Sequence, residues 1–300
     1  MYTQLIVPLD ESSVAEQVLP YARYLTEGLK VPLELITAVD VAGIATSNAD
    51  EVKNFSKFVG DIRMASETYL NRIAKMFPES AVTCSVNTGK PEAVIIEKAK
   101  QNKGTLIAMA THGRSGLNRW FLGSVAEKVL RGTSNPLLLV RAVQDEKANG
   151  QLNLQSIIVP LDTSEAAETA LSDATELAKR LNASIILAHV YNLPLASYFG
   201  SGDYYNPRYK SLATQLKGES HKYLEEKVAD VKQRGLEKVA PIFLEGSPAE
   251  EIIALGRRHP NSLIAMTTHG RSGLQRWVLG SVTEKVVRGA ENPVLVVRGN

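Results

Sequence analysis

The sequence predicts an α/β protein built from two tandem, doubly wound domains. One pattern occurs twice: the segment at 5–13 returns at 157–165, and the segment at 110–141 returns at 267–298 with 23 of 32 positions identical. Short apolar runs alternate with helical patterns inside each copy, which is typical of a parallel sheet covered on both faces. The length of 300 residues also fits about two domains.

The elements of the first copy follow from its turn residues and its apolar spacing. The expected strands comprise residues 5–9, 33–39, 82–88, 105–110 and 136–140. Four helices are expected. The first follows a cap at Ser12 or Ser13, the second spans about 51–77, the third starts at Pro91, and the fourth runs from Gly123 to Arg131. Five parallel strands joined by such helices predict the strand order 3-2-1-4-5, and we expect the same order in the second copy.

The boundary between the copies lies in a polar stretch that contains an Asn-Gly pair. We therefore expect a first domain at 1–142, a linker at 143–155 and a second domain at 156–300. The spacing between equivalent residues grows from 152 (Asp10 to Asp162) to 157 (Gly89 to Gly246). The second copy thus gains five residues, which we place near the Tyr-rich segment 198–209, interpreted either as a lid on a ligand or as a surface loop.

Composition and charge exclude several classes of partner. The formal net charge is +2 and the positive residues are interleaved with acids, so we expect neither nucleic acid nor a membrane as partner. No apolar run reaches the length of a membrane span, and the first residues do not form a signal peptide. The single cysteine, Cys84, cannot form an internal disulfide and fits a small packed residue. We therefore expect a cytoplasmic protein.

Two motifs are expected to meet at the carboxyl edge of each sheet. Asp10 ends the first strand of the first copy, and the loop that begins Thr111-His112-Gly113 ends its fourth strand. In the order 3-2-1-4-5 these two strands are neighbours whose connections leave in opposite directions, which is the point where such sheets bind ligands.

The loop has the chemistry of a phosphate site. Gly113 allows close backbone approach, Gly123 and Ser124 open a helix whose free N–H groups favour an anion, and Arg114 could pair with a phosphate. A plain turn before a capped helix is the alternative. The equivalent residues of the second copy are Gly270, Arg271, Gly280 and Ser281.

Several residues allow a catalytic and a structural interpretation. Asp10 and Asp162 fit either a catalytic carboxylate or, more commonly, a helix cap or a ligand for a ribose hydroxyl. His112 and His269 fit a base, a metal ligand or a hydrogen bond that shapes the loop; no further ligands at metal-binding spacing accompany them, so we expect no metal held by the protein and assign no catalytic residue.

These motifs resemble the universal stress protein family in its nucleotide-binding branch. The family pattern is Gly-x-x-Gly, nine residues, then Gly-Ser or Gly-Thr, and both copies match it from the Thr-His-Gly triplet onward. The first glycine is Ala110 in one copy and Thr267 in the other. Because threonine is β-branched at a point where a ribose or phosphate would pass, we expect binding in the first copy and a weaker or structural site in the second.

The resemblance implies a Rossmann-like fold that binds ATP, or ADP or AMP, with Mg²⁺ or Mn²⁺ at the phosphates. Asp10 and Asp162 would lie by the adenine and ribose, and Val39 and Val190 would touch the adenine. The phosphates would be held by Gly113, Gly123, Ser124 and Val125, and by Gly270, Gly280, Ser281 and Val282.

The resemblance also implies an assembly and a function. The last strands, Leu137–Val140 and Val294–Val297, would pair within one molecule as a pseudo-dimer, which could pair further as a homodimer. We expect a regulatory stress-response module with at most slow ATP hydrolysis. The alternatives are a ligand-free interaction scaffold and a genuine ATPase or nucleotidyl-transfer enzyme, so the sequence leaves enzymatic activity open.

Overall fold

The computed structural model describes residues 2–42, 55–111, 122–142, 152–191, 207–268 and 279–298. The chain divides into two compact units, Met1–Asn153 and Leu154–Asn300. The histidine, arginine and tryptophan residues of the two loops, together with Gly113 and Gly270, lie outside the described residues, as does the Tyr-rich segment up to residue 206.

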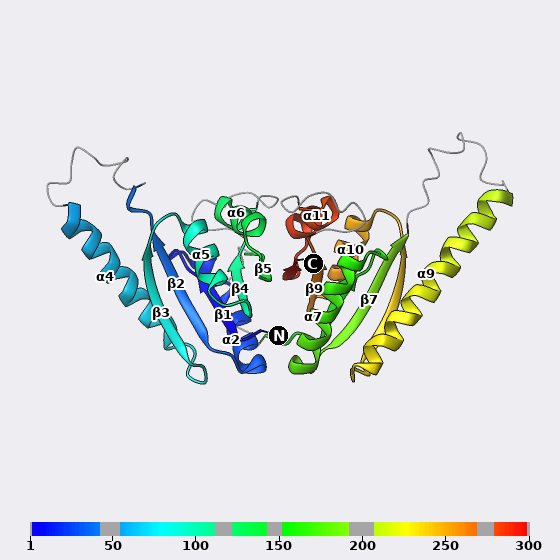
Figure 1. Cartoon of the computed structure of the whole chain (residues 1–300), viewed down its shortest axis with the longest axis horizontal. Helices are drawn as coiled ribbons and strands as arrows, with labels where there is room; N and C mark the ends of the chain where they lie inside the picture. The colour runs from blue at the N-terminus through cyan, green and yellow to red at the C-terminus, as the bar shows by residue number, and fades with distance from the viewer. Residues whose placement is uncertain are drawn as a thin grey trace. The chain divides into compact units, whose positions relative to one another are not determined.

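Unit one alternates strands and helices as the sequence predicts (Figure 1). Its elements are β1 (Gln4–Pro8), α1 (Ser13–Glu16), α2 (Leu19–Leu29), β2 (Leu33–Val39), α4 (Phe55–Ala74), β3 (Val82–Thr88), α5 (Pro91–Lys100), β4 (Thr105–Ala110), α6 (Ser124–Gly132) and β5 (Leu137–Val140).

The sheet of unit one is parallel in the order β3-β2-β1-β4-β5, which confirms the predicted topology. Helices α2 and α4 cover one face, where Arg72 of α4 is paired with Glu16 and Ser80 is bonded to Thr26. Helices α5 and α6 pack together on the opposite face. This is the arrangement that right-handed crossovers produce around a parallel sheet.

Unit two repeats the plan of unit one. Its elements are β6 (Ser156–Pro160), α7 (Glu165–Leu181), β7 (Ser184–Tyr191), α9 (Pro207–Gln233), β8 (Val239–Glu245), α10 (Pro248–Arg258), β9 (Ser262–Thr267), α11 (Ser281–Gly289) and β10 (Val294–Val297). Its strands are parallel in the order β8-β7-β6-β9-β10.

The core of each unit is formed by its central strands. All six residues of β4 and all six of β9 are buried, as are all four residues of β5 and of β10. Strands covered on both faces bury every side chain, so their sequences are continuous apolar runs rather than alternating ones. Among the described residues, no helix combines the length and the apolar character needed to cross a bilayer.

Pro20 divides the first helix of unit one. The sequence analysis expects one helix after Ser12, but the structure has the short α1 and then α2, with Pro20 in the first turn of α2. Proline has no N–H to donate to the carbonyl four residues earlier, so a continuous helix would lose that bond. The equivalent position in unit two is Ser172, and α7 runs without a break over 17 residues.

Candidate functional site

Each unit has a pocket at the carboxyl edge of its sheet, beside the strands where the connections diverge. In unit one the pocket has a volume of about 360 Å³ and lies between the end of β1, the end of β4 and the start of α6. Its described lining residues are Pro8, Leu9, Asp10, Ala15, Ile36, Ala38, Pro91, Ile95, Met109, Ala110, Thr111, Gly123, Ser124, Val125 and Ala126. The structure thus brings four predicted site residues of unit one into one cavity.

Asp10 is held in place by a tight turn at the end of β1. Its Oδ1 accepts hydrogen bonds from the backbone N–H of Ser12 at 3.1 Å and from the Ser12 hydroxyl at 2.5 Å. Between them Glu11 has φ of 67°, a left-handed conformation that costs a non-glycine residue energy. Such strain often accompanies functional sites, and here it fixes the direction of the carboxylate.

The same turn is present in unit two with different residues. The Oδ1 of Asp162 accepts from the backbone N–H of Ser164 at 3.1 Å and from its hydroxyl at 2.5 Å. Thr163 takes the left-handed position with φ of 68°, although it is β-branched. The geometry, rather than the residue at this position, is therefore what the two units share.

Ser164 is also the N-cap of α7, because its hydroxyl oxygen accepts from the backbone N–H of Ala167 at 3.2 Å. We predict that Ser164→Ala lowers the free energy of unfolding by about 1–2 kcal/mol, because it removes both the serine cap and the bond that the hydroxyl donates to Asp162. Urea unfolding followed by circular dichroism measures this loss. Ser172→Ala, at an exposed position within α7, is the matched control and should cause no loss.

The start of α6 presents backbone N–H groups to the pocket. The helix begins at Ser124 after Gly123, which has no side chain to cap it, and the N–H of Gly123 donates to the carbonyl of Thr111 at 2.7 Å. The N–H of Glu127 is the first to bond back to Gly123, at 2.9 Å. The N–H groups of Ser124, Val125 and Ala126 therefore lie before the helical ladder, at the positive end of the helix dipole, where an anion is favoured.

Two helices beside the pocket are tied together by an ion pair. The ammonium of Lys128 on α6 lies 2.9 Å from a carboxylate oxygen of Glu92 in the first turn of α5. The hydrogen bond from Lys128 holds the pKa of Glu92 below its ordinary value. Because Lys128 is 59% exposed, solvent screens the pair and its contribution to stability stays below about 1 kcal/mol.

The Glu92–Lys128 pair predicts a small, pH-dependent contribution to stability. A carboxyl with a lowered folded pKa stabilises the fold above its unfolded pKa of about 4.3 and loses this effect as the pH falls through the folded value. We expect Lys128→Met to lower the melting temperature slightly at pH 7, and we expect this difference from the parent chain to shrink as the pH falls below about 4.3. A difference that stays constant as the pH is lowered would contradict this electrostatic origin.

Alternation along β2 decides which of its residues face the pocket. Ala38 lines the pocket of unit one, whereas Val39 is 5% exposed and belongs to the core. In unit one Ala38 pairs with Asn87, and in unit two Val190 pairs with Leu244. Leu244 is the equivalent of Asn87, so Val190 is the equivalent of Ala38 and not of Val39. Val190 does line the pocket of unit two, beside Tyr191. The two valines are therefore not equivalent: Val190 lines the pocket of its unit, whereas Val39 does not.

The floor of the pocket in unit one is apolar and is absent from the sequence-based list. It is formed by Ile36 on β2, Ile95 on α5 and Met109 on β4. Ile36 could have been found from the two-residue period of a strand, because it lies two positions before Ala38. Ile95 could not, because only the packing of α5 on the sheet brings it there.

The pocket of unit two is larger and more polar than that of unit one. Its volume is about 500 Å³, and its lining includes Asp162, Val190, Gly280, Ser281 and Val282. Thr267 and Thr283 line it where unit one has Ala110 and Ala126, and the Thr283 hydroxyl donates to the carbonyl of Thr267 at 2.7 Å. The β-branched residue singled out in the sequence thus lies in the pocket wall.

A histidine also distinguishes unit two. The Nδ1 of His189 lies 2.7 Å from the carbonyl oxygen of Leu161, so Nδ1 must carry the proton. In unit one the Thr37 hydroxyl makes the equivalent bond to the carbonyl of Leu9 at 3.0 Å. His189 lines the pocket of unit two, whereas Thr37 does not line that of unit one. The walls of the two pockets therefore differ, although the loops after β4 and β9 are nearly identical in sequence.

The fold and these pockets define a class of protein: two doubly wound α/β domains in tandem, each with a cavity at the divergence of its central strands. The model of the Universal stress protein family matches residues 1–141 and again 153–298. The chain therefore belongs to the universal stress protein family, in a tandem form, as the sequence motifs predict.

Known relatives match single units or the whole chain. A universal stress protein of Methanocaldococcus jannaschii is 32% identical over 151 residues, which cover 50% of this chain and 85% of that protein. One from Mycobacterium tuberculosis is 23% identical over 308 residues, covering 98% of this chain and 96% of that one. The structure of a universal stress protein from Archaeoglobus fulgidus has a TM-score of 0.72 at 19% identity and covers 98% of both chains, which supports the fold.

Proposed function

We propose that this chain is a regulatory protein that binds an adenine nucleotide, ATP in the first instance, in the pocket of unit one. The observation that carries the proposal is that one cavity of about 360 Å³ combines an apolar floor, a fixed carboxylate and the open N-terminus of a helix. A nucleotide has a flat base, a hydroxyl-bearing sugar and an anionic tail, so its three parts match the three walls.

In this proposal each wall of the pocket binds one part of the nucleotide. The base lies on the floor formed by Ile36, Ile95 and Met109, and the ribose hydroxyls donate to Asp10. The phosphates accept from the first N–H groups of α6, at Ser124 and Val125. Gly113 and Arg114 would add contacts from the loop, and Mg²⁺ or Mn²⁺ would neutralise part of the phosphate charge.

Unit two is proposed as a second and weaker nucleotide site. Asp162, Gly280, Ser281 and Val282 line its pocket in the same relation to the strands, with Gly270 and Arg271 expected to contribute from the loop. Thr267 adds a branched side chain to the wall. We expect an affinity for ATP at least about tenfold lower than that of unit one, which corresponds to about 1.4 kcal/mol of lost contact or added strain.

The remaining expectations complete the proposal. Residues 1–142 and 156–300 act as the two nucleotide-binding domains, in a cytoplasmic protein with at most slow hydrolysis of ATP. The pairing of Leu137–Val140 with Val294–Val297, and any further homodimer, stay predictions.

The proposal is tested on the purified protein without adding a ligand. The chain is denatured, and the released small molecules are identified and counted by mass spectrometry. Isothermal titration with Mg-ATP on the emptied protein then gives affinity and stoichiometry. Adenine nucleotide in the released fraction, or binding with one tight and one weak site, supports the proposal; absence of both overturns it.

A further inference from the structure

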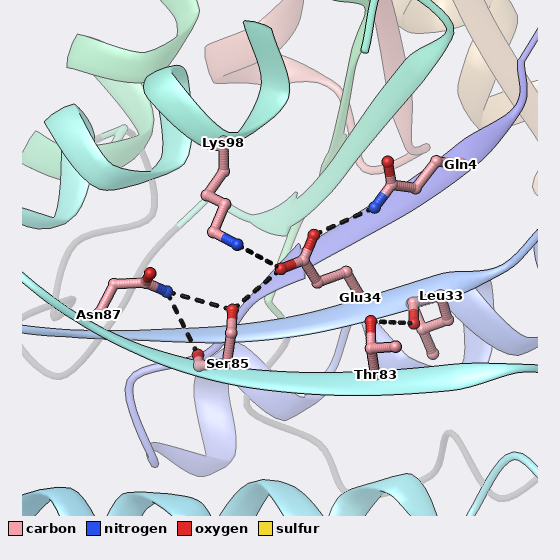
Figure 2. Close-up of polar contacts among 7 residues, drawn as sticks. All are labelled: Gln4, Leu33, Glu34, Thr83, Ser85, Asn87 and Lys98. Atoms are coloured by element: carbon pink, nitrogen blue, oxygen red, sulfur yellow. Dashed lines mark hydrogen bonds and ion pairs between the residues drawn. The ribbon is translucent and has the colours of Figure 1, made fainter. Parts of the chain in front are cut away.

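A charged residue lies inside the sheet–helix interface of unit one. Glu34 of β2 has a side chain that is 12% exposed, on the face covered by α5. Its Oε1 accepts from the ammonium of Lys98 at 2.9 Å and from the Ser85 hydroxyl at 2.9 Å, and its Oε2 accepts from the amide of Gln4 at 3.0 Å (Figure 2). We call these four residues the Glu34 network.

The members of this network come from both halves of the unit. We define the first half as β1 to α4 and the second half as β3 to β5. Gln4 and Glu34 belong to the first half, whereas Ser85 on β3 and Lys98 on α5 belong to the second. Each half therefore contributes one charge of the ion pair, and neither half can satisfy its charge alone.

Unit two has no such network at the equivalent positions. The register of the strands and the start of α10 at Pro248 identify them. Gln4, Glu34, Ser85 and Lys98 correspond to Ser156, Ile186, Ile242 and Leu255. Ile186 is 8% exposed and Leu255 is 1% exposed, so this interface of unit two is an apolar contact.

The two units share the same strand order, and the ends of their second halves are closely similar in sequence. The second halves agree at 23 of 32 positions over 110–141 and 267–298. The second half of unit one is also followed directly in the chain by the first half of unit two. The topology therefore allows the first half of one unit to pair with the second half of the other, within a chain or between two chains. Such misassembly is characteristic of repeat proteins.

We propose that the Glu34 network is a recognition surface by which the first half of unit one accepts its own second half and rejects that of unit two. An exchanged unit would place Glu34 against Leu255, and its counterpart would place Lys98 against Ile186. Each charge, at a position that is 12% exposed for Glu34 and 24% exposed for Lys98, would then face an apolar side chain instead of its partner, which is unfavourable, whereas the correct pairing satisfies both. The network supplies specificity by penalising the wrong partner.

The single natural cysteine allows the two pairings to be counted. Cys84 on β3 lies in register with Leu35 of β2, and Leu187 is the equivalent of Leu35 on β7. In a chain with Leu35→Cys, oxidation links the new thiol to Cys84 where β3 pairs correctly. In a chain with Leu187→Cys, it links to Cys84 only where β3 has paired with β7. Both leucines are fully buried, so the two reporters are matched.

The first variant removes the difference between the units. Gln4→Ser, Glu34→Ile, Ser85→Ile and Lys98→Leu together give unit one the apolar contact of unit two. Each reporter chain is refolded from denaturant and oxidised, and the linked species are counted by non-reducing gel and mass spectrometry. We expect the Leu187→Cys link to rise at least about tenfold over its level in the parent chain. An unchanged level overturns the proposal.

The second variant restores the difference between the units by placing the Glu34 network in unit two instead of unit one. To the four changes above it adds Ser156→Gln, Ile186→Glu, Ile242→Ser and Leu255→Lys. We expect the Leu187→Cys link to return to the parent level, because the units again differ. A purely structural role of the network in unit one cannot produce this rescue, and a link as high as in the first variant overturns the proposal.

A charge-reversed variant decides the question if the moved network does not fold. Glu34→Lys with Lys98→Glu keeps the pair in unit one and keeps unit two unchanged. We expect correct pairing as in the parent chain, reported by the Leu35→Cys link. Exchange at the level of the apolar variant contradicts the proposal.

Discussion

Replacement of Ser124 by glutamate is expected to weaken ATP binding in unit one strongly while leaving the fold intact. Ser124 is exposed at the first position of α6, so the longer side chain can be accommodated. Its carboxylate would occupy the helix N-terminus and repel the phosphates, a juxtaposition that costs on the order of 2 kcal/mol or more. The affinity should therefore fall at least about 30-fold.

The same variant should be no less stable than the parent chain. An acidic side chain in the first turn interacts favourably with the helix dipole, by about 0.3–1 kcal/mol at an exposed position. Isothermal titration with Mg-ATP and thermal melting without ligand separate the two effects. Binding that is lost together with stability would point to unfolding instead.

Ser281→Glu is the matched control, since Ser281 begins α11 in unit two. It should spare the tight site and remove only the weak one. If both variants bind ATP as the parent chain does, the helix N-termini do not hold the phosphates, and the proposed position of the phosphates is wrong in both units.

The strands were predictable because their signals are local. The segments at 33–39, 82–88 and 105–110 are observed as β2, β3 and β4 with the predicted bounds. Each is a short run ended by turn or cap residues, so no distant contact is needed to place it. Pro20 carried a local signal for the break between α1 and α2, whereas the expected single helix rested on the cap at Ser12 or Ser13 alone.

The site was predictable only in part, because its walls combine distant segments. Asp10 and Gly123 could be placed by the strand order, which brings β1 and β4 together. The choice between Ala38 and Val39 depends on which face of β2 carries the pocket, and that is set by the packing of α5. The contacts of Glu34, outside the pocket, were the least predictable, since its three partners come from three other elements.

A repeated Asn-Pro pair in the sequence corresponds to a buried polar anchor in each unit. Asn292 is 5% exposed, and its Nδ2 donates to the carbonyl of His259 at 3.0 Å and to the carbonyl and hydroxyl of Ser262, each at 3.1 Å. These bonds tie the turn before β9 to the start of β10. In unit one the Nδ2 of Asn135 makes two longer bonds, to the carbonyls of Asn102 at 3.2 Å and Thr105 at 3.3 Å.

Asn292→Asp is expected to cost 3–5 kcal/mol of the stability of unit two, on the order found when a buried charge lacks a partner. The substitution keeps the shape of the side chain but replaces a donor by a carboxylate oxygen. This oxygen faces two carbonyl oxygens and the Ser262 hydroxyl, whose hydrogen is donated to the carbonyl of His259 at 2.7 Å. Urea unfolding at pH 7 measures the loss, and hydrogen exchange at the amides of β9 assigns it to unit two.

Two comparisons separate this explanation from a general sensitivity of the turn. Ser262→Ala removes one of the three bonds of Asn292, together with the bond that the Ser262 hydroxyl donates to the carbonyl of His259 at 2.7 Å, and adds no charge; it should cost about 1–2 kcal/mol. Asn135→Asp should destabilise unit one by less than Asn292→Asp destabilises unit two, because its two bonds are longer. If Asn292→Asp costs no more than Ser262→Ala, then the amide is not what holds β9 and β10 in register beside the pocket.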